Sequence, residues 1–495
     1  MDSLTARRHP HPWRVFAATS IGVVAVFISL SGLTVALPTV TRELDASGAQ
    51  STWILLGYML VTTALILVFG RLADILGRRP LYLAGLVTFT VATGLCLLAP
   101  SAGWLIAARV LQGVGAAAVV TNNTALLTDT FPPRLLGRAL GWNATVAAVA
   151  QVVGPLIGGA ATAALGWRGL FVVVLPVGMA AIVASLWVIP RSSRTSGTRE
   201  SFDLTGAVLS TALLTTIVLA LTPGAGSIPW LPWVGGGASL VLATAFVVVQ
   251  VRRAHPLVDL SLFRERGIAL VLVAVLVNAV ATYAVTLLVS LYGQAVNGIS
   301  AVAAGALVMP VAFGTVVAAA AAGSLMLRFS PRILTAIGMA LNAVGLVGVA
   351  LVLSDDGAAL AATAPFLFVL GCGSGLFMTP STSALMLTAP PDRRGIANGL
   401  RSTLQNVGYL LSTALALVFA TVGLSATARQ AAYGGTLGAL GSDEVARFVD
   451  NVRLVSLALA AVAVVGVLVC LSFPRRNVTA AVHPLESVTP LKESA

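Results

Sequence analysis

Side chains that could carry out chemistry are scarce in this chain of 495 residues, and nearly all of them lie between its long apolar segments. The 17 Asp and Glu residues and the four His residues fall in the connecting or terminal regions. Catalysis at membrane depth would need such groups clustered near a nucleophile or a base, and no such cluster is visible. The three cysteines, Cys96, Cys372 and Cys470, lie in different apolar segments without CxxC spacing. The sequence therefore predicts no enzyme, no metal site and no cofactor.

Arg109 is the one charged residue that we place inside an apolar segment. An Arg at the centre of a bilayer costs about 2.5 to 3.5 kcal/mol on insertion scales, so a retained one usually lines a cavity. We expect Arg109 and its neighbour Gln112 to lie in such a cavity. The alternative is a position near the outer end of the segment, from which the side chain reaches the membrane surface.

Uncharged polar residues inside the apolar segments are candidates for orienting a substrate. We expect Asn123, Asn278 and Tyr283 to share the cavity with Arg109. Hydrogen bonds between helices, without any ligand, are the alternative interpretation for each of them. The same two interpretations apply to the other polar residues of the segments, which are Asn122, Asn143, Gln151, Asn342, Gln405 and Asn406.

The composition indicates that the main solvent of this chain is the lipid bilayer. Hydrophobic residues make up 58% of the chain and charged residues 9%, and the mean hydropathy is +0.97. A soluble protein has about a quarter charged residues and could not hide so much apolar surface. The net charge of +12 does not indicate nucleic-acid binding, because the basic residues flank the apolar segments and form no continuous stripe.

Fourteen apolar segments reach the length of roughly 20 residues that a membrane-spanning helix needs. The first is longer than the apolar region of a signal peptide, so we expect it to be retained. The predicted spans are residues 15–38, 52–70, 80–99, 104–127, 140–163, 169–189, 204–222, 231–251, 268–291, 301–326, 333–353, 361–387, 396–420 and 452–473.

The positions of Lys and Arg predict the orientation of these spans. Short cytoplasmic loops retain basic residues, and most of the 29 Lys and Arg residues fall in the loops that share a side with the N-terminus. Both termini are therefore expected in the cytoplasm. Arg is far more abundant than Lys, as GC-rich bacterial genomes produce, so the expected location is a bacterial cytoplasmic membrane.

An internal repeat relates the two ends of the chain. Two prolines, two glycines and an alanine within Pro132–Gly141 recur within Pro390–Gly399, and other glycines recur at the same offset of 258 residues. Helices 1 to 6 therefore correspond to helices 9 to 14. The expected organisation is an N-terminal six-helix half (1–190), a linker with an inserted hairpin of helices 7 and 8 (191–267), a C-terminal six-helix half (268–476) and a disordered cytoplasmic tail (477–495).

The loop after the second span carries the most specific motif, which reads GRLADILGRR from Gly70 to Arg79. It resembles the GxLaDrxGrr signature of the major facilitator superfamily. Gly70 and Gly77 permit close packing, and we expect Asp74 to face arginines or a helix N-terminus across the interface between the halves. With Arg78 and Arg79, these residues would latch the cytoplasmic side shut when the carrier opens outward. A positive-inside loop with a single acid is the alternative.

The fourth and fifth spans carry two further patterns of that superfamily. The segment from Leu105 to Ala116 is similar to its LxxxRxxqGxgaa pattern, and the fifth span resembles the GPxxGG motif associated with exporters. That motif comprises Gly154, Pro155, Gly158 and Gly159. Pro155 removes a backbone hydrogen bond and the glycines allow close helix contacts, so a bend here is a candidate pivot. Small-residue packing with no role in export is the alternative.

The order of the motifs and the fourteen spans resemble the drug:proton antiporter branch of this superfamily over nearly the whole chain. The resemblance implies an all-α polytopic fold of two six-helix halves plus a two-helix hairpin, with a substrate site near the midplane. It also implies a monomer in the lipid bilayer that exports small lipophilic compounds, such as drugs or antibiotics, by alternating access. Protons are the implied coupled ion.

The first helix departs from that branch. Its members usually carry an acid ahead of a VALP segment, and Ser29 stands at the acid's expected place. In the second half, Leu327 stands where Asp74 stands in the first. Because no carboxylate or imidazole lies at mid-membrane, proton coupling follows only from the resemblance. A dedicated exporter of one self-made metabolite, such as an antibiotic or a siderophore, and a non-transporting sensor of the same fold are the alternative functions.

Overall fold

The computed structural model describes residues 11–190, 203–221, 231–253, 258, 260–354, 360–390 and 393–474. These residues form helices and connecting turns, and no strand occurs among them. Fourteen helices are long and apolar enough to cross a membrane, which confirms the predicted fold class and number of spans. The side chain of Asp74, residues 191–202 of the predicted linker and the tail after Pro474 lie outside the described residues.

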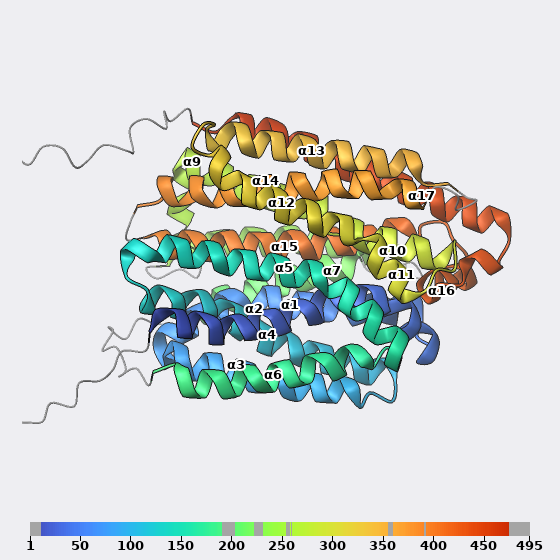
Figure 1. Cartoon of the computed structure of the whole chain (residues 1–495), viewed down its shortest axis with the longest axis horizontal. Helices are drawn as coiled ribbons and strands as arrows, with labels where there is room; N and C mark the ends of the chain where they lie inside the picture. The colour runs from blue at the N-terminus through green and yellow to red at the C-terminus, as the bar shows by residue number, and fades with distance from the viewer. Residues whose placement is uncertain are drawn as a thin grey trace, which may run out of the picture.

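The N-terminal half is a bundle of six helices joined by short turns (Figure 1). The helices are α1 (Pro12–Glu43), α2 (Gly48–Leu76), α3 (Arg78–Leu97), α4 (Ala102–Thr130), α5 (Pro133–Leu165) and α6 (Gly169–Val188). Serine side chains determine where several of these helices begin. At the start of α2, the Ser47 side chain accepts a hydrogen bond from the backbone N–H of Gln50, and the Gln50 side chain accepts one from the backbone N–H of Ser47. At the start of α4, the Ser101 side chain accepts from the backbone N–H of Trp104.

The C-terminal half repeats this arrangement, although two of its spans are interrupted. One span consists of α9 and α10, and another consists of α11 and α12. The second interruption lies next to Pro310, which has no N–H group to continue the ladder of helical hydrogen bonds. The helices are α9 (Arg266–Thr282), α10 (Val285–Ala295), α11 (Ala301–Leu307), α12 (Met309–Leu325), α13 (Pro331–Val352), α14 (Ala364–Thr388), α15 (Arg394–Ala420) and α17 (Ser442–Leu471).

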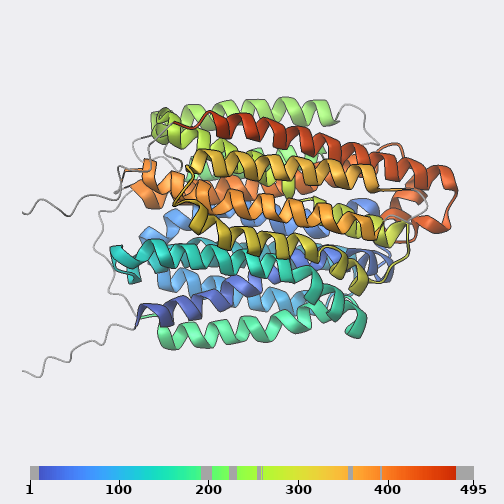
Figure 2. The ribbon, with the colours of Figure 1, turned by 45° about the horizontal axis from the view of Figure 1, so that its top comes forward.

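The packing of the helices repeats between the halves as the sequence repeat requires. In the N-terminal half, α4 packs against α2 and α3, and α1 packs against α5 and α6. In the C-terminal half, α14 packs against α12 and α13, and α9 packs against α15 and α17. The first helix begins and the last helix ends at the same end of the bundle (Figure 2).

The inserted hairpin consists of α7 (Leu204–Leu221) and α8 (Leu231–Arg252). Helix α7 packs against α2 and α15, whereas α8 packs mainly against α7 and is largely exposed to the surroundings. Asp203 connects the two helices of the hairpin at one end. Its carboxylate accepts hydrogen bonds from the backbone N–H of Gly206 on α7 and from the side chain of Gln250 on α8. The hairpin is therefore attached at the side of the bundle where the two halves meet.

The long loop that the sequence predicted between residues 420 and 452 is largely helical. It contains the short helix α16 (Ala426–Gly434), and α17 begins ten residues earlier than expected. Ser425 caps α16, and Gly435 ends it with a φ of 69°, which few other residues adopt. The buried ring of Tyr433 anchors this helix to the bundle. We call the end of the bundle that carries α16 the outer end.

Hydrogen bonds join the two halves at the outer end. Arg42 at the end of α1 donates to the carbonyl oxygen of Gly434, and Thr52 of α2 donates to the hydroxyl of Tyr433 at 3.4 Å. Gln294 of α10 donates to the carbonyl oxygen of Val35 at 3.1 Å. These contacts close the outer end of the interface between the halves.

Candidate functional site

A cavity of about 110 Å³ lies between the two halves. Its walls come from α1, α2 and α5 on one side and from α9, α10, α12, α14 and α15 on the other. Most of the lining is apolar, and its polar groups are Ser, Thr, Asn, Gln and Tyr side chains. No Asp, Glu, His, Lys or Arg lines it within the described part of the chain. Such a cavity can bind an apolar molecule and orient it through a few hydrogen bonds.

Two tyrosines form the polar side of this cavity. The rings of Tyr283 and Tyr409 stack with their centroids 4.2 Å apart and their planes at 26°. Gln151, from the other half, lines the cavity together with both tyrosines. Behind Tyr409, Gln405 donates to its hydroxyl oxygen at 2.6 Å and accepts a hydrogen bond from Arg401 at 3.0 Å. The polar side is therefore built by both halves.

A second polar group of the cavity is anchored by neighbouring helices. Asn278 of α9 lines the cavity, and its side-chain oxygen accepts a hydrogen bond from Asn342 of α13 at 3.0 Å. Ser374 of α14 donates to Asn342 at 3.4 Å and also lines the cavity. Asn278 thus combines the two roles that the sequence left open, since it joins helices and also faces the cavity.

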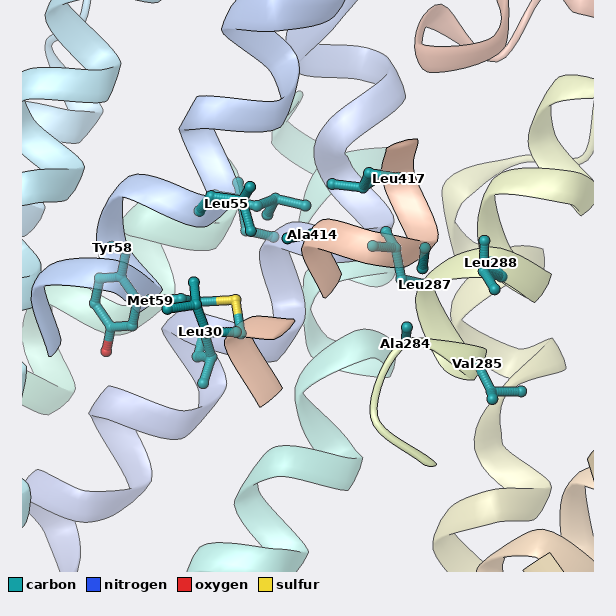
Figure 3. Close-up of a cluster of buried hydrophobic side chains, with 14 of the residues drawn as sticks. Leu30, Leu55, Tyr58, Met59, Ala284, Val285, Leu287, Leu288, Ala414 and Leu417 are labelled. Atoms are coloured by element: carbon teal, nitrogen blue, oxygen red, sulfur yellow. The ribbon is translucent and has the colours of Figure 1, made fainter. Parts of the chain in front are cut away.

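The apolar side of the cavity is part of the buried hydrophobic cluster drawn in Figure 3. Leu30 of α1, Leu55 and Met59 of α2 and Leu287 of α10 meet there and line the cavity. Tyr58 belongs to the same turn of α2, but its ring points away from Leu287 (Figure 3). The apolar side is therefore also shared by both halves.

Arg109 lies behind this apolar wall and does not line the cavity. Its side chain is completely buried. The guanidinium lies over the ring of Tyr58, 4.1 Å from the centroid, and donates hydrogen bonds to Ser29 and Gln112. Gln112 in turn donates to Thr93 at 2.8 Å, so it also belongs to this network behind the wall. The alternative, a side chain that reaches the surface, does not hold either, because Arg109 is completely buried.

One nitrogen of Arg109, Nη2, has no hydrogen-bond partner among the described residues. No carboxylate of the described chain forms an ion pair with this side chain either. The positive charge is therefore balanced by carbonyl and hydroxyl dipoles and by an aromatic face. The network joins α1, α2, α3 and α4 into one unit.

Asn123 also lies away from the cavity. Its side-chain nitrogen donates to the side-chain oxygen of Asn143 at 2.7 Å, which joins α4 to α5. Of the residues that the sequence assigned to the cavity, Asn278 and Tyr283 line it, whereas Arg109, Gln112 and Asn123 do not.

The GRLADILGRR motif is helical rather than a loop: Gly70 to Leu76 end α2, Arg78 and Arg79 begin α3, and Gly77 alone forms the turn between them. Gly77 has a φ of 92°, which explains the glycine at this position. Arg78 forms an ion pair with Asp129 at the end of α4, and Arg79 donates to the carbonyl oxygen of Leu186 on α6 at 3.3 Å. A side chain at Gly70 would contact Thr121 of α4. These contacts all lie within the N-terminal half.

The glycines of the GPxxGG motif lie at two close helix contacts. A side chain at Gly154 or Gly158 would overlap Ser31 or Gly32 of α1. A side chain at Gly159 would overlap the carbonyl oxygen of Ala301, at the start of α11 in the other half. Pro155 lines the cavity and lies inside α5. The motif therefore packs α5 against its own half and against the opposite half.

Two residues of this site escaped the sequence analysis. Tyr409 was not considered, and Arg401 was left out of the charges inside the spans, although it lies within the predicted span 396–420 and seven residues inside α15. The statement that Arg109 is the one charge inside a span is therefore wrong. The signal was present, because Arg401, Gln405 and Tyr409 follow each other at intervals of four residues and lie on one helical face.

A protein-family model and several known proteins match most of this chain. Residues 19–413 match the model of the Major Facilitator Superfamily. The Tetracenomycin C resistance and export protein of Streptomyces glaucescens is 32% identical over 410 residues, which cover 82% of this chain and 75% of that protein. Riboflavin transporter RibZ of Clostridioides difficile (strain 630) is 27% identical over 402 residues, which cover 81% of this chain and 87% of that protein.

A solved structure has the same fold. It is a bacterial homolog to the human lysosomal transporter Spinster, in an inward-facing and unoccupied conformation. The match has a TM-score of 0.64 at 16% sequence identity and covers 94% of this chain and 97% of that one. At this identity the likeness concerns the arrangement of the helices.

Proposed function

Because this chain belongs to the Major Facilitator Superfamily, we propose that it exports small lipophilic compounds across the bacterial cytoplasmic membrane by alternating access. One observation carries this proposal most directly: the cavity is lined by both halves, while hydrogen bonds close the interface at its outer end. A site shared by two rigid halves can be exposed to either side when the halves rock against each other. The export direction is supported by the GPxxGG motif and by the relative named as an export protein.

The lining of the cavity favours neutral or weakly anionic substrates. A buried organic cation needs a carboxylate or an aromatic cage to replace its lost hydration, and no carboxylate lines this cavity in the described residues. Apolar walls would supply most of the binding, and Asn278 and the two tyrosines would orient the substrate. Arg109 lies behind the apolar side of the cavity, and its positive charge would attract an anionic substrate.

Proton coupling belongs to this proposal on the basis of the family resemblance. The carboxylates that could take part lie at the ends of helices: Glu43, Asp45, Asp74 and Asp129. Of these, Asp129 is paired with Arg78, and Glu43 lies 3.9 Å from Arg168. Flux that persists after collapse of the proton gradient would instead indicate another ion or passive exchange.

The cytoplasmic latch is a proposal of the same kind. Gly70, Asp74, Gly77, Arg78 and Arg79 would hold the inner ends of the halves together in the outward-open state. Asp74→Asn is then expected to slow turnover more than it weakens substrate binding. Wild-type flux in that variant would refute the latch.

A dedicated exporter of one self-made metabolite is the second candidate function, since the relative from Streptomyces glaucescens is named for a single compound. A non-transporting sensor of the same fold is the third. Resistance profiles in a host that lacks its own pumps would distinguish the first two. A broad profile supports a multidrug exporter, and protection against one compound alone supports the dedicated one.

Transport itself is tested in inverted membrane vesicles. We expect energised vesicles to accumulate neutral lipophilic dyes, and a bulky side chain in the cavity, Ala148→Trp, to stop this accumulation. Val241→Trp is the matched control, because that residue lies on the exposed face of α8, away from the cavity. Absence of dye movement in the wild type, or equal movement in both variants, would contradict the proposal.

A further inference from the structure

The hydroxyl group of Tyr409 has a determined hydrogen-bond direction. A guanidinium can only donate hydrogen bonds, so the Gln405 atom that faces Arg401 at 3.0 Å must be the amide oxygen. The amide nitrogen of Gln405 then faces Tyr409 and donates to its hydroxyl oxygen at 2.6 Å. Because that oxygen accepts from Gln405, the O–H hydrogen of Tyr409 has to point elsewhere.

The surroundings of Tyr409 direct this hydrogen toward the cavity. The ring is held by its stack with Tyr283, and both rings line the cavity. Gln151 also lines the cavity, on the opposite half. The O–H group therefore points toward the cavity, where a substrate oxygen can accept its hydrogen bond.

The charge of Arg401 strengthens this donor. Arg401 forms no ion pair with any described carboxylate and instead donates to Asn398 at 3.1 Å and to Gln405. In a chain of hydrogen bonds each bond polarises the next, and the effect is larger where the surroundings are poorly polarisable. Arg401 and Gln405 thus act as positioning residues that make the Tyr409 hydroxyl a better donor.

We propose that Tyr409 determines substrate specificity: its hydroxyl, oriented by Arg401 through Gln405, selects lipophilic aromatic compounds that carry a carbonyl or phenolate oxygen. The apolar body of such a compound packs against Leu55 and Leu287, and its oxygen accepts the hydrogen bond of the Tyr409 hydroxyl. This inference rests on the proposed function, since it names the class of compound that the transport cavity takes.

A matched pair of probes isolates this interaction. The compounds 2-aminoanthraquinone and 2-aminoanthracene are both planar, neutral and tricyclic, and the first carries the carbonyl oxygens that the second lacks. Their dissociation constants are measured by equilibrium dialysis with the full-length protein in lipid nanodiscs. We expect the wild type to bind the quinone roughly 3- to 10-fold more tightly, the value of one neutral hydrogen bond.

Three variants test the direction of the bond. Tyr409→Phe keeps the stacked ring and removes the donor, so the ratio of the two dissociation constants should fall to about 1. Gln405→Glu keeps an acceptor for Arg401 but draws the Tyr409 hydrogen toward the new carboxylate, with the same expected result. Tyr82→Phe is the control, because it removes a buried tyrosine hydroxyl that donates to the carbonyl oxygen of Thr19 and does not line the cavity, so it should keep the wild-type ratio.

The outcomes separate this inference from the proposed function. Equal binding of both probes by the wild type, an unchanged ratio in Tyr409→Phe, or a lost ratio in Tyr82→Phe would overturn it. Should Gln405→Glu fail to fold, as judged by thermal unfolding, Tyr409→Phe still decides. If the wild type prefers the quinone but energised vesicles export neither probe, the proposed export function fails while the assignment of Tyr409 stands.

Discussion

Arg109 on α4 donates a hydrogen bond to the hydroxyl of Ser29 on α1, with the nitrogen and oxygen 3.1 Å apart in a completely buried site. Ser29 occupies the place where related drug:proton antiporters are expected to carry an acid. The guanidinium of Arg109 therefore lies next to a hydroxyl at the position where a carboxylate would balance its charge. This pairing explains how the chain keeps a buried Arg without a carboxylate, because Tyr58 and Gln112 complete its surroundings.

Restoring a negative charge at this position should stabilise the protein. Ser29→Asp places a carboxylate next to a buried cation whose Nη2 has no partner in the described residues, and buried charges gain most from a paired, hydrogen-bonded neighbour. We expect a higher thermal midpoint for Ser29→Asp than for the neutral, equally large Ser29→Asn, measured by tryptophan fluorescence of purified protein. An equal or lower midpoint would show that the charge needs no counter-ion.

The close contact between α5 and α1 should not tolerate a methyl group. Gly158→Ala would overlap the backbone of Gly32, and overpacking of this kind typically costs about 1–3 kcal/mol. Gly141→Ala on the same helix meets nothing within 4 Å and is expected to stabilise by about 0.5–1 kcal/mol, because Gly is a poor helix former. Thermal unfolding of both variants checks the contrast, which should be opposite in sign.

The outer closure should loosen when Arg42 is removed. Arg42→Ala loses the hydrogen bond to Gly434 that ties α1 to the end of α16. A cysteine at Thr34, which lines the cavity, should then react several-fold faster with an impermeant thiol reagent added outside intact cells. The control is Arg447→Ala, since Arg447 donates to Gly423 within its own half. Equal labelling rates in the two backgrounds would show that Arg42 plays no part in closure.

A carboxylate placed in the cavity should admit organic cations. Asn278→Asp keeps the acceptor oxygen that Asn342 uses and adds a negative charge to the lining. A close opposite charge in a partly desolvated site supplies more than the 1.4 kcal/mol that a tenfold change requires, so the KM for ethidium should fall roughly tenfold. Ser442→Asp adds the same charge on the exposed outer surface and should leave this KM unchanged.

The orientation of the bundle is tested by labelling single cysteines in intact cells. Gly441→Cys at the outer end should react with an impermeant reagent, whereas Leu327→Cys between α12 and α13 should not. Leu327 is 82% exposed, so only the membrane can shield it. The background carries Cys372→Ala, because Cys372 is the one native cysteine that is not fully buried. The opposite labelling pattern would place both termini outside.

The sequence by itself determined the number of spans, the pairing of the halves and the position of the inserted hairpin. These features depend on the length and hydropathy of single segments and on glycine and proline residues that recur at a constant offset. They are local properties, because each segment spans the bilayer according to its own length and hydropathy. Gly77 differs from this expectation: the sequence assigned it to close packing, whereas the structure shows a positive φ that favours glycine.

The tertiary structure alone decided which side chains face the cavity. A helix surrounded by lipid is apolar on every side, so its sequence does not mark the face that turns inward as a soluble amphipathic helix does. Arg109 and Gln112 therefore turned out to lie behind the wall, whereas Asn278 and Tyr283 line it. Gln151 and Tyr409, which line the same cavity, are more than 250 positions apart in the sequence. Their shared place depends on how the two halves pack together, which no local pattern of residues encodes.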